Sequence, residues 1–240
     1  MTWVKICGVT NLEDAQAAVE AGADALGFVF YDKSPRYLEP ARAQEIAGRL
    51  PDSVNKIGVF VDAHANRVRE IAEQAAMTGV QIHYTTQNTP EQSAIDRGAM
   101  VKPFKAYMAL PMAWFLEQED RLQALTADFV QAAQSMNALP AEAREAFDTI
   151  LFDSGNLTTP GGTGQIFDWE RVAELTKVAS KNFKVILAGG LTPENVARAI
   201  DILHPWGVDV SSGVEIKPGK KDAGKVRDFI SKVRRAGKAA

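Results

Sequence analysis

The sequence predicts a (β/α)8 TIM barrel, an α/β fold in which eight parallel strands alternate with helices. Eight short apolar runs rich in β-branched residues are separated by amphipathic segments, as in a parallel sheet covered by helices. The length of 240 residues suits one such barrel, because these domains commonly contain ~200–250 residues. None of the runs is polar enough for the edge strand that a doubly wound open sheet, the competing fold, requires. We therefore expect residues 1–240 to form a single barrel domain.

The predicted strands are continuous apolar runs, as expected for strands buried on both faces. They cover Val4–Ile6, Ala25–Phe30, Lys56–Val61, Val80–His83, Met100–Ala106, Thr149–Phe152, Val185–Ala188 and Val208–Val210. The segments between them repeat apolar residues at helical spacing. The predicted helices cover Asn11–Ala21, Ala41–Leu50, Asn66–Ala76, Pro90–Arg97, Glu119–Ser135, Asp168–Ala179, Pro193–Ile202 and Ala223–Val233.

One connection, around residues 107–148, is longer than a barrel needs between its fifth and sixth strands. Met108–Phe115 is apolar and aromatic, and a second helical stretch is expected over Ala141–Ala146. Because long loops without structure are uncommon in compact domains, this region predicts an insertion-like helical segment. Its simplest role is packing on the outside of the barrel, and a lid or an oligomer contact is the alternative.

Composition excludes several classes of function. The 27 basic and 30 acidic residues give a net charge of -3, which argues against a mainly electrostatic nucleic-acid binder. No apolar run approaches the ~20 residues that span a bilayer, so we expect no membrane partner. A single cysteine cannot form an internal disulfide, which predicts a reducing, cytoplasmic location.

Two reactive side chains stand at predicted strand ends. Cys7 follows the first strand, in the run from Lys5 to Gly8, and Asp153 ends the sixth. In a parallel barrel both would face the same mouth, where a thiol and a carboxyl group can act as a base and an acid. Taken alone, Cys7 is better explained as a small buried apolar residue, because that is the more common role of a buried free cysteine.

A third candidate, Arg36, stands just beyond the second strand, beside the rigid Pro35. The planar guanidinium fork of arginine suits a carboxylate ligand. A solvated loop arginine is the alternative interpretation of this residue.

Glycine-bearing loops follow the last three predicted strands, at Gly161–Gly164, Ala188–Pro193 and Ser211–Val214. Glycine lets the backbone approach an anion closely and point N–H groups at it. Barrels often hold phosphate between their last two loops, at the start of a short extra helix, which we expect at Gly213–Glu215. The loops contain no dinucleotide or Walker fingerprint, so they imply no nucleotide cofactor.

Taken in order along the chain, these motifs closely resemble the phosphoribosylanthranilate isomerases, the barrel family of tryptophan biosynthesis. The matching blocks are Lys5–Thr10, Gly27–Arg36, Gly58–Asp62, Val80–His83, Gly161–Trp169, Leu187–Val196, Gly207–Glu215 and Pro218–Asp222. Two departures are visible. Tyr84 stands where the family usually has glycine, and residues 107–148 match poorly.

The resemblance implies an Amadori rearrangement, in which N-(5-phosphoribosyl)anthranilate becomes 1-(o-carboxyphenylamino)-1-deoxyribulose 5-phosphate. By motif, Asp153 is the acid that opens the furanose ring, and Cys7 is the base that removes the C2 proton. We expect a raised pKa for Asp153 and, with Lys5 as a source of positive charge, a thiol pKa below ~8.5 for Cys7. The Schiff base is its own electron sink, so no cofactor and no metal are expected.

The resemblance also implies a small-molecule phosphoribosyl substrate and the residues that bind it. Arg36 would bind the anthranilate carboxylate, and backbone groups of the glycine loops would bind phosphate. The implied binding residues are Arg36, His83, Gly162, Gly189, Gly190, Asp209, Ser211, Ser212 and Gly213. For Asp209 a structural role is an equal alternative, and for His83 the alternative is a hydrogen-bonded inward-facing histidine.

Other functions stay open at this point. One is a related sugar-phosphate isomerase of histidine biosynthesis, or a dual-substrate version. Those enzymes use two carboxylates, so the thiol of Cys7 argues against them. Another is a non-catalytic barrel that binds sugar phosphate, which would need the glycine loops but not the acid and base. The sequence allows a monomer or a homodimer.

Overall fold

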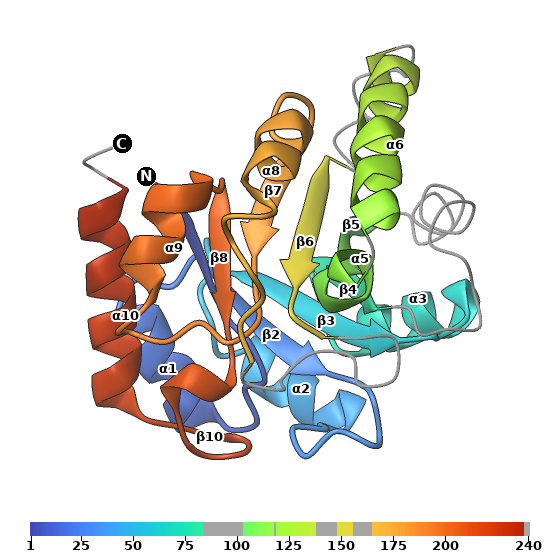
Figure 1. Ribbon diagram of the computed structural model, residues 1–240. Coiled ribbons are helices and arrows are strands. Elements are labelled where there is room, and N and C mark those ends of the chain that lie inside the picture. Colours follow the sequence, from blue (N-terminus) through green and yellow to red (C-terminus); the bar gives the residue numbers. More distant parts are fainter. Residues whose placement is uncertain (84–102, 118, 138–147, 156–164, 238–240) are drawn as a thin grey trace.

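The computed structural model describes residues 1–83, 103–117, 119–137, 148–155 and 165–237. Its strands form one closed barrel in chain order, with every neighbouring pair parallel (Figure 1). The prediction of a (β/α)8 barrel is therefore confirmed. Among the described residues, no helix is long and apolar enough to cross a membrane.

The strand bounds follow the predicted runs closely, except for the fifth. The strands are β1 Trp3–Ile6, β2 Ala25–Val29, β3 Asn55–Val61, β4 Gly79–His83, β5 Lys105–Pro111, β6 Thr149–Asp153, β7 Lys184–Leu187 and β8 Gly207–Val210. The helices are α1 Leu12–Glu20, α2 Pro40–Ala47, α3 Ala65–Gln74, α5 Met112–Leu116, α6 Glu119–Asn137, α8 Ala173–Ala179, α9 Val196–Leu203 and α10 Ala223–Ala236. The helices expected at Pro90–Arg97 and Ala141–Ala146 lie outside the described residues.

The prediction for the fifth strand was wrong in its bounds. The strand was expected over Met100–Ala106, but β5 begins at Lys105 and continues to Pro111. Much of the segment expected as an outside helix, Met108–Phe115, is therefore strand, and α5 supplies one short helix after it. Tyr107 and Ala109 fill the inside of the barrel, which explains the apolar and aromatic character of this segment.

The barrel is packed on both sides of its wall, which explains why the strands are apolar without alternation. Inward-facing residues form a compact plug low in the barrel, made of Ala25, Ile57, Tyr107, Ala109, Leu151, Ile186 and Ala188. A larger apolar cluster lies between the strands and the surrounding helices. On this outer side Phe129 of α6 packs against Phe152 of β6. Because the plug closes the bottom, an inner cavity can open only at the other end.

The short extra helix expected to start at Gly213–Glu215 is present after β8, one residue earlier, as a three-residue 3-10 helix at Ser212–Val214. Glu215 then begins a small hairpin of β9 Glu215–Lys217 and β10 Lys220–Lys221 (Figure 1). Asp222 ends the hairpin and caps α10, because its carboxylate accepts from the backbone N–H groups of the first turn.

Candidate active site

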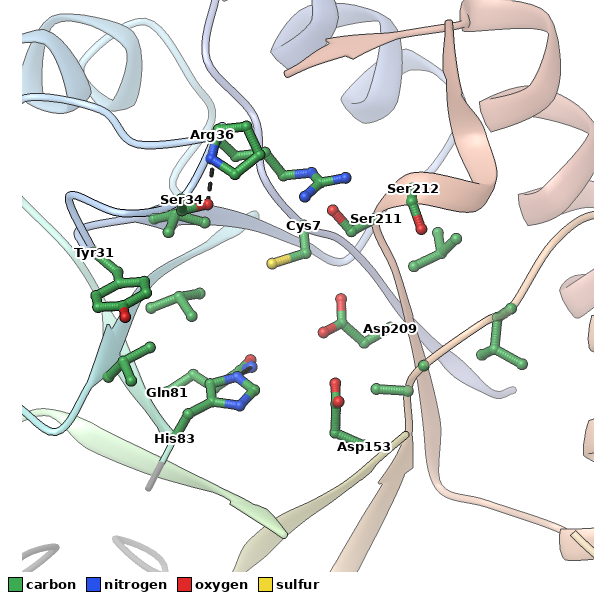
Figure 2. A pocket seen from close by; sticks show the side chains of 18 of the residues that line it. Cys7, Tyr31, Ser34, Arg36, Gln81, His83, Asp153, Asp209, Ser211 and Ser212 are labelled. Atoms are coloured by element: carbon green, nitrogen blue, oxygen red, sulfur yellow. Dashed lines mark hydrogen bonds between the residues drawn. The ribbon is translucent and has the colours of Figure 1, made fainter. Parts of the chain in front are cut away.

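The carboxyl ends of the strands surround a cavity of about 400 Å³. Figure 2 shows Cys7 at its centre, with Asp153, Asp209 and His83 directed into the same space. Most of the predicted site residues line it, namely Cys7, Arg36, His83, Asp153, Gly189, Gly190, Asp209, Ser211 and Ser212. Gly213 follows in the turn after Ser212, and Gly162 lies outside the described residues.

The two-residue period of the strands explains why these side chains meet. On β1, Val4 and Ile6 are buried against the outer cluster, so Lys5 and Cys7 point inward. The same spacing brings Gln81 inward two residues before His83. Each of these strands thus contributes one polar residue within the barrel and a second at its mouth.

A buried hydrogen-bonded network begins at Lys5, whose side chain is 1% exposed. Its Nζ donates to Asp209 Oδ2 at 2.6 Å and to Gln81 Oε1 at 2.8 Å. Gln81 Nε2 lies 2.7 Å from His83 Nε2, and an amide nitrogen can only donate, so the ring carries its proton on Nδ1. Burial opposes the charge of Lys5, but Asp209 and Cys7 outweigh it and raise the Lys5 pKa.

Burial raises the pKa of the Cys7 thiol above its usual value. The positive charge of Lys5 opposes this effect, whereas Asp209 reinforces it. The prediction of a lowered thiol pKa was therefore wrong. The reason is that Cys7 is buried and that the negative charge of Asp209 offsets most of the positive charge of Lys5.

Burial shifts the pKa of both Asp153 and His83 in the direction that favours the neutral form of each group. Burial raises the pKa of Asp153, although its Oδ1 accepts from Gly155 N at 2.6 Å, so the prediction of a raised pKa is confirmed. Burial, aided by the charge of Lys5, lowers the pKa of His83 to about 4. His83 is thus hydrogen-bonded and faces inward, as its alternative interpretation predicted.

Arg36 forms the upper wall of the cavity and is only 9% exposed, so the interpretation as a solvated loop arginine is wrong. Its Nε and Nη2 donate to the two carboxylate oxygens of Glu215, at 2.9 and 2.7 Å. Lys221 Nζ donates to the same carboxylate at 2.9 Å. Burial opposes the charges here too, but Arg36 and Lys221 hold the pKa of Glu215 below its usual value.

The glycine loops after β7 and β8 touch each other closely. Gly190 has a φ of 64°, in the left-handed region, and a Cβ there would overlap the carbonyl oxygen of Gln165. A Cβ on Gly213 would overlap the carbonyl oxygen of Leu191. Glycine is therefore required for these backbones to approach, and the result is a wall formed mainly by backbone groups beside Ser211 and Ser212.

Comparisons with known proteins decide the family. The sequence model of the N-(5'-phosphoribosyl)anthranilate (PRA) isomerase family matches residues 4–105 and 117–232. The chain belongs to the PRA isomerase family. The family member from Geotalea uraniireducens (strain Rf4) is 42% identical over 235 residues, which cover 98% of this chain and 99% of that protein.

Solved structures of PRA isomerases agree with this assignment. One, from Thermotoga maritima and described as monomers generated from a dimeric enzyme, has a TM-score of 0.73 and 34% identity, covering 98% of this chain and 100% of that one. Another, with the same TM-score of 0.73, identity of 34% and coverage of 98% and 100%, contains reduced 1-(o-carboxyphenylamino)-1-deoxyribulose 5-phosphate.

Sequence reasoning did not single out Gln81, which lines the cavity of this PRA isomerase, or the ion-paired residues Glu215 and Lys221 beside Arg36. For Gln81 a signal exists, because it stands two residues before His83 on one strand. Glu215 has no local signal, since its partner Arg36 lies 179 positions away. Within the described residues, no group of three or more His, Cys, Asp or Glu is placed to hold a metal ion.

Proposed function

We propose that the chain catalyses the Amadori rearrangement of N-(5-phosphoribosyl)anthranilate to 1-(o-carboxyphenylamino)-1-deoxyribulose 5-phosphate, a step of tryptophan biosynthesis. One observation carries the proposal: a member of the PRA isomerase family places the single thiol and a buried carboxyl group with a raised pKa in one cavity at the barrel mouth. A non-catalytic binder of sugar phosphate would need neither group.

Asp153 acts first, as a general acid. Its proton goes to the ring oxygen of the furanose, the C1–O bond breaks, and the nitrogen lone pair forms the iminium of a Schiff base. The raised pKa of Asp153 supports this role, because a carboxyl group with the usual pKa would have lost its proton at neutral pH. A buried carboxyl group also regains its proton readily after turnover.

Cys7 acts second, as the base that removes the C2 proton. The electron pair of the C–H bond moves into the iminium and gives an enolamine, which becomes the ketone by protonation at C1 and loss of the hydroxyl proton. The thiol is largely protonated in the unliganded protein. The iminium formed in the first step adds a positive charge beside Cys7 and, together with Lys5, favours the thiolate when the base is needed.

Two groups of donors hold the ends of the substrate. Arg36 binds the anthranilate carboxylate at the upper wall of the cavity, and its guanidinium suits that ligand. The phosphate lies against the backbone of Gly189, Gly190, Ser212 and Gly213, beside the Ser211 hydroxyl, with Gly162 from the preceding loop. Asp209 accepts a hydrogen bond from a sugar hydroxyl, and the neutral His83 lines the cavity beside it.

Turnover tests the proposal directly. Purified protein should remove the fluorescence of phosphoribosylanthranilate catalytically, and the gene should restore growth without tryptophan to a strain that lacks this isomerase. Cys7→Ser and Asp153→Asn serve as matched inactive controls. A stoichiometric fluorescence change without turnover would instead identify a binder, and turnover of the phosphoribosyl imidazole substrate of histidine biosynthesis would identify the dual-substrate alternative.

Location and assembly stay predictions. The single cysteine predicts a cytoplasmic enzyme. The chain is predicted to be a monomer or a homodimer, and sedimentation of the purified protein distinguishes the two.

A further inference from the structure

We propose that Glu215 is a positioning residue that fixes the Arg36 guanidinium for the substrate carboxylate and ties it to the phosphate loop. This inference rests on the proposed function, because it assumes that Arg36 meets the anthranilate carboxylate. Glu215 is not one of the two proposed catalytic residues. It acts on the cavity only through Arg36, which lines the cavity wall.

The contacts of Glu215 engage both of its carboxylate oxygens. Oε1 accepts from Arg36 Nε at 2.9 Å, from Lys221 Nζ at 2.9 Å and from the backbone N–H of Gly219 at 3.2 Å. Oε2 accepts from Arg36 Nη2 at 2.7 Å. The Glu215 side chain is 4% exposed, so water does not compete with these donors. A carboxylate held by these contacts keeps its position and its hydrogen bonds to Arg36 when a ligand binds in the cavity.

The N–H donors of the Arg36 guanidinium are consequently divided between Glu215 and a ligand in the cavity. A guanidinium has five N–H donors, and Glu215 takes two of them. The remaining donors are on the terminal nitrogens, where a ligand in the cavity can reach them, because Arg36 lines its wall. The substrate carboxylate therefore adds to an existing ion pair instead of replacing Glu215.

Charge makes this arrangement favourable for an anion. Burial lowers the pKa of Lys221, although Glu215 opposes this shift. With all three groups ionised, Arg36 and Lys221 contribute two positive charges and Glu215 one negative charge, so the cluster keeps one net positive charge. That single charge matches one carboxylate. Without Lys221, Glu215 would neutralise Arg36 and remove most of its attraction for an anion.

Glu215 also connects the two binding ends of the cavity. It directly follows the Ser212–Val214 turn, whose backbone is proposed to hold phosphate. Lys221 Nζ, bound to Glu215, also donates to the carbonyl of Ser211 at 3.3 Å. The hairpin is fastened from outside as well, because Thr10 Oγ1 donates to the Gly219 carbonyl at 2.5 Å. Glu215 thus fixes the spacing between the carboxylate and phosphate contacts.

A pair of substrates separates positioning from a purely structural role. One substrate is N-(5-phosphoribosyl)anthranilate, and the other is N-(5-phosphoribosyl)aniline, which lacks the carboxylate. In Glu215→Gln one acceptor oxygen becomes a donor, so the bidentate contact with Arg36 is lost. We expect KM for the first substrate to rise about tenfold, with kcat changed less than about twofold, since the lost interaction corresponds to roughly 1.4 kcal/mol. For the second substrate, kcat/KM should stay as in the wild type.

Two further variants keep the test decisive. Glu13→Gln is the matched control, because Glu13 is exposed and pairs with Lys220 of the same hairpin at 2.9 Å without touching Arg36, so both substrates should behave as in the wild type. Glu215→Asp keeps the charge for folding but shortens the side chain by one methylene, and the KM increase for the carboxylated substrate should persist.

The inference is overturned if Glu215→Gln and Glu215→Asp affect both substrates equally, or lower the melting temperature while KM for the carboxylated substrate is unchanged. Failure of the proposed function itself looks different. In that case the wild-type protein would not turn over phosphoribosylanthranilate at all, which the same assay measures first.

Discussion

Two buried ion pairs, one within the barrel and one at its rim, are built from the same chemistry but leave their carboxylates in different states. At the centre, Lys5 pairs with Asp209 at 2.6 Å, and Asp209 Oδ1 has no hydrogen-bond partner among the described residues. At the rim, Arg36 pairs with Glu215 at 2.7 Å, and both oxygens of Glu215 are occupied. A buried acceptor without a partner is costly unless a ligand fills it.

This difference separates the roles of the two regions. The central pair faces the thiol and the acid and keeps one acceptor for the substrate, so changes near it should alter the chemical step. The rim pair is saturated and holds a binding group, so changes there should alter affinity. The central region should therefore affect kcat, and the rim should affect KM.

The largest effect is expected from Asp153→Asn at the centre. The substitution keeps the shape but removes the donated proton, and general acid catalysis typically contributes ~10²–10⁴-fold. We expect kcat to fall by that factor, while the affinity for a reduced product analogue stays near normal. Steady-state kinetics and calorimetric titration measure the two quantities, and activity within a few-fold of the wild type would remove Asp153 from the mechanism.

Asp148→Asn is the matched control at the other end of the same strand. Asp148 pairs with Lys105 at 2.8 Å and Lys184 at 2.7 Å on the face opposite the cavity. Its loss should lower the melting temperature but leave kcat unchanged, because ion pairs at the bottom of a barrel contribute to stability, whereas the chemistry takes place at the other end.

At the rim, Arg36→Met should weaken the carboxylated substrate far more than it changes kcat. The lost charged hydrogen bond is worth roughly 1.5–3 kcal/mol, which lowers kcat/KM by about 10–100-fold. Glu215 keeps Lys221 as a partner, so the variant is expected to fold. Arg42→Met, on the exposed surface of α2, is the control and should have no effect. An unchanged kcat/KM in Arg36→Met would show that another group binds the carboxylate.

The sequence predicts an element of the fold well when the residues that define its two ends are close together in the sequence. Seven strands were predicted within one or two residues, since each is a short apolar run that is buried on both faces. The fifth was shifted because Lys105–Pro111 is followed directly by the apolar Met112 and Phe115, so the run has no polar boundary where the strand ends. The short helix after β8 was predicted one residue late, and the hairpin that follows it was not predicted, because Glu215–Lys221 has no apolar run long enough to indicate a strand.

A site residue was predictable when its position at the end of a predicted strand was enough to place it at the barrel mouth. Cys7, Asp153 and Arg36 stand at strand ends, and the barrel brings strand ends together without further information. The shift of the Cys7 pKa was predicted in the wrong direction. The pKa depends on burial and on the compensation of the Lys5 charge by Asp209, and both are set by the tertiary structure. Glu215 was missed for the same reason, since Arg36, the partner that connects it to the site, comes from a distant loop.

A third prediction concerns His83 and the stability of the centre in acid. The folded-state pKa of about 4 lies below the usual 6.5, so the unfolded chain binds more protons between these values. The resulting stability is fully present above pH 6.5 and is lost as the pH falls toward 4, by about 2 kcal/mol between pH 6.5 and 5. His83→Asn should remove this part of the pH dependence in urea unfolding. Parallel curves for the wild type and His83→Asn would contradict the assignment.

The smallest effect is expected on the reactivity of Cys7, where two variants should shift the thiol pKa in opposite directions. Because Cys7 is the only cysteine, iodoacetamide labelling reports on this thiol alone. Lys5 and Cys7 face the same gap at Gly27, where a Cβ would lie 3.1 Å from Lys5 Cε and 2.7 Å from the sulfur. Lys221 adds a second positive charge nearby, and Asp209 is the opposing carboxylate. Lys5→Met should therefore raise the thiol pKa further and slow labelling at pH 8, and Asp209→Asn should lower it and speed labelling.

The opposite signs separate electrostatics from damage to the fold. Both variants break the same buried ion pair, and removing either partner of such a pair typically destabilises a protein by ~3–5 kcal/mol. Loss of packing alone would expose the thiol and speed labelling in both. Opposite shifts of the pH–rate profile can arise only from the charges, and kcat should fall in Lys5→Met because the thiolate becomes harder to form. Equal shifts in the two variants would show that the central pair supports the barrel without controlling the base.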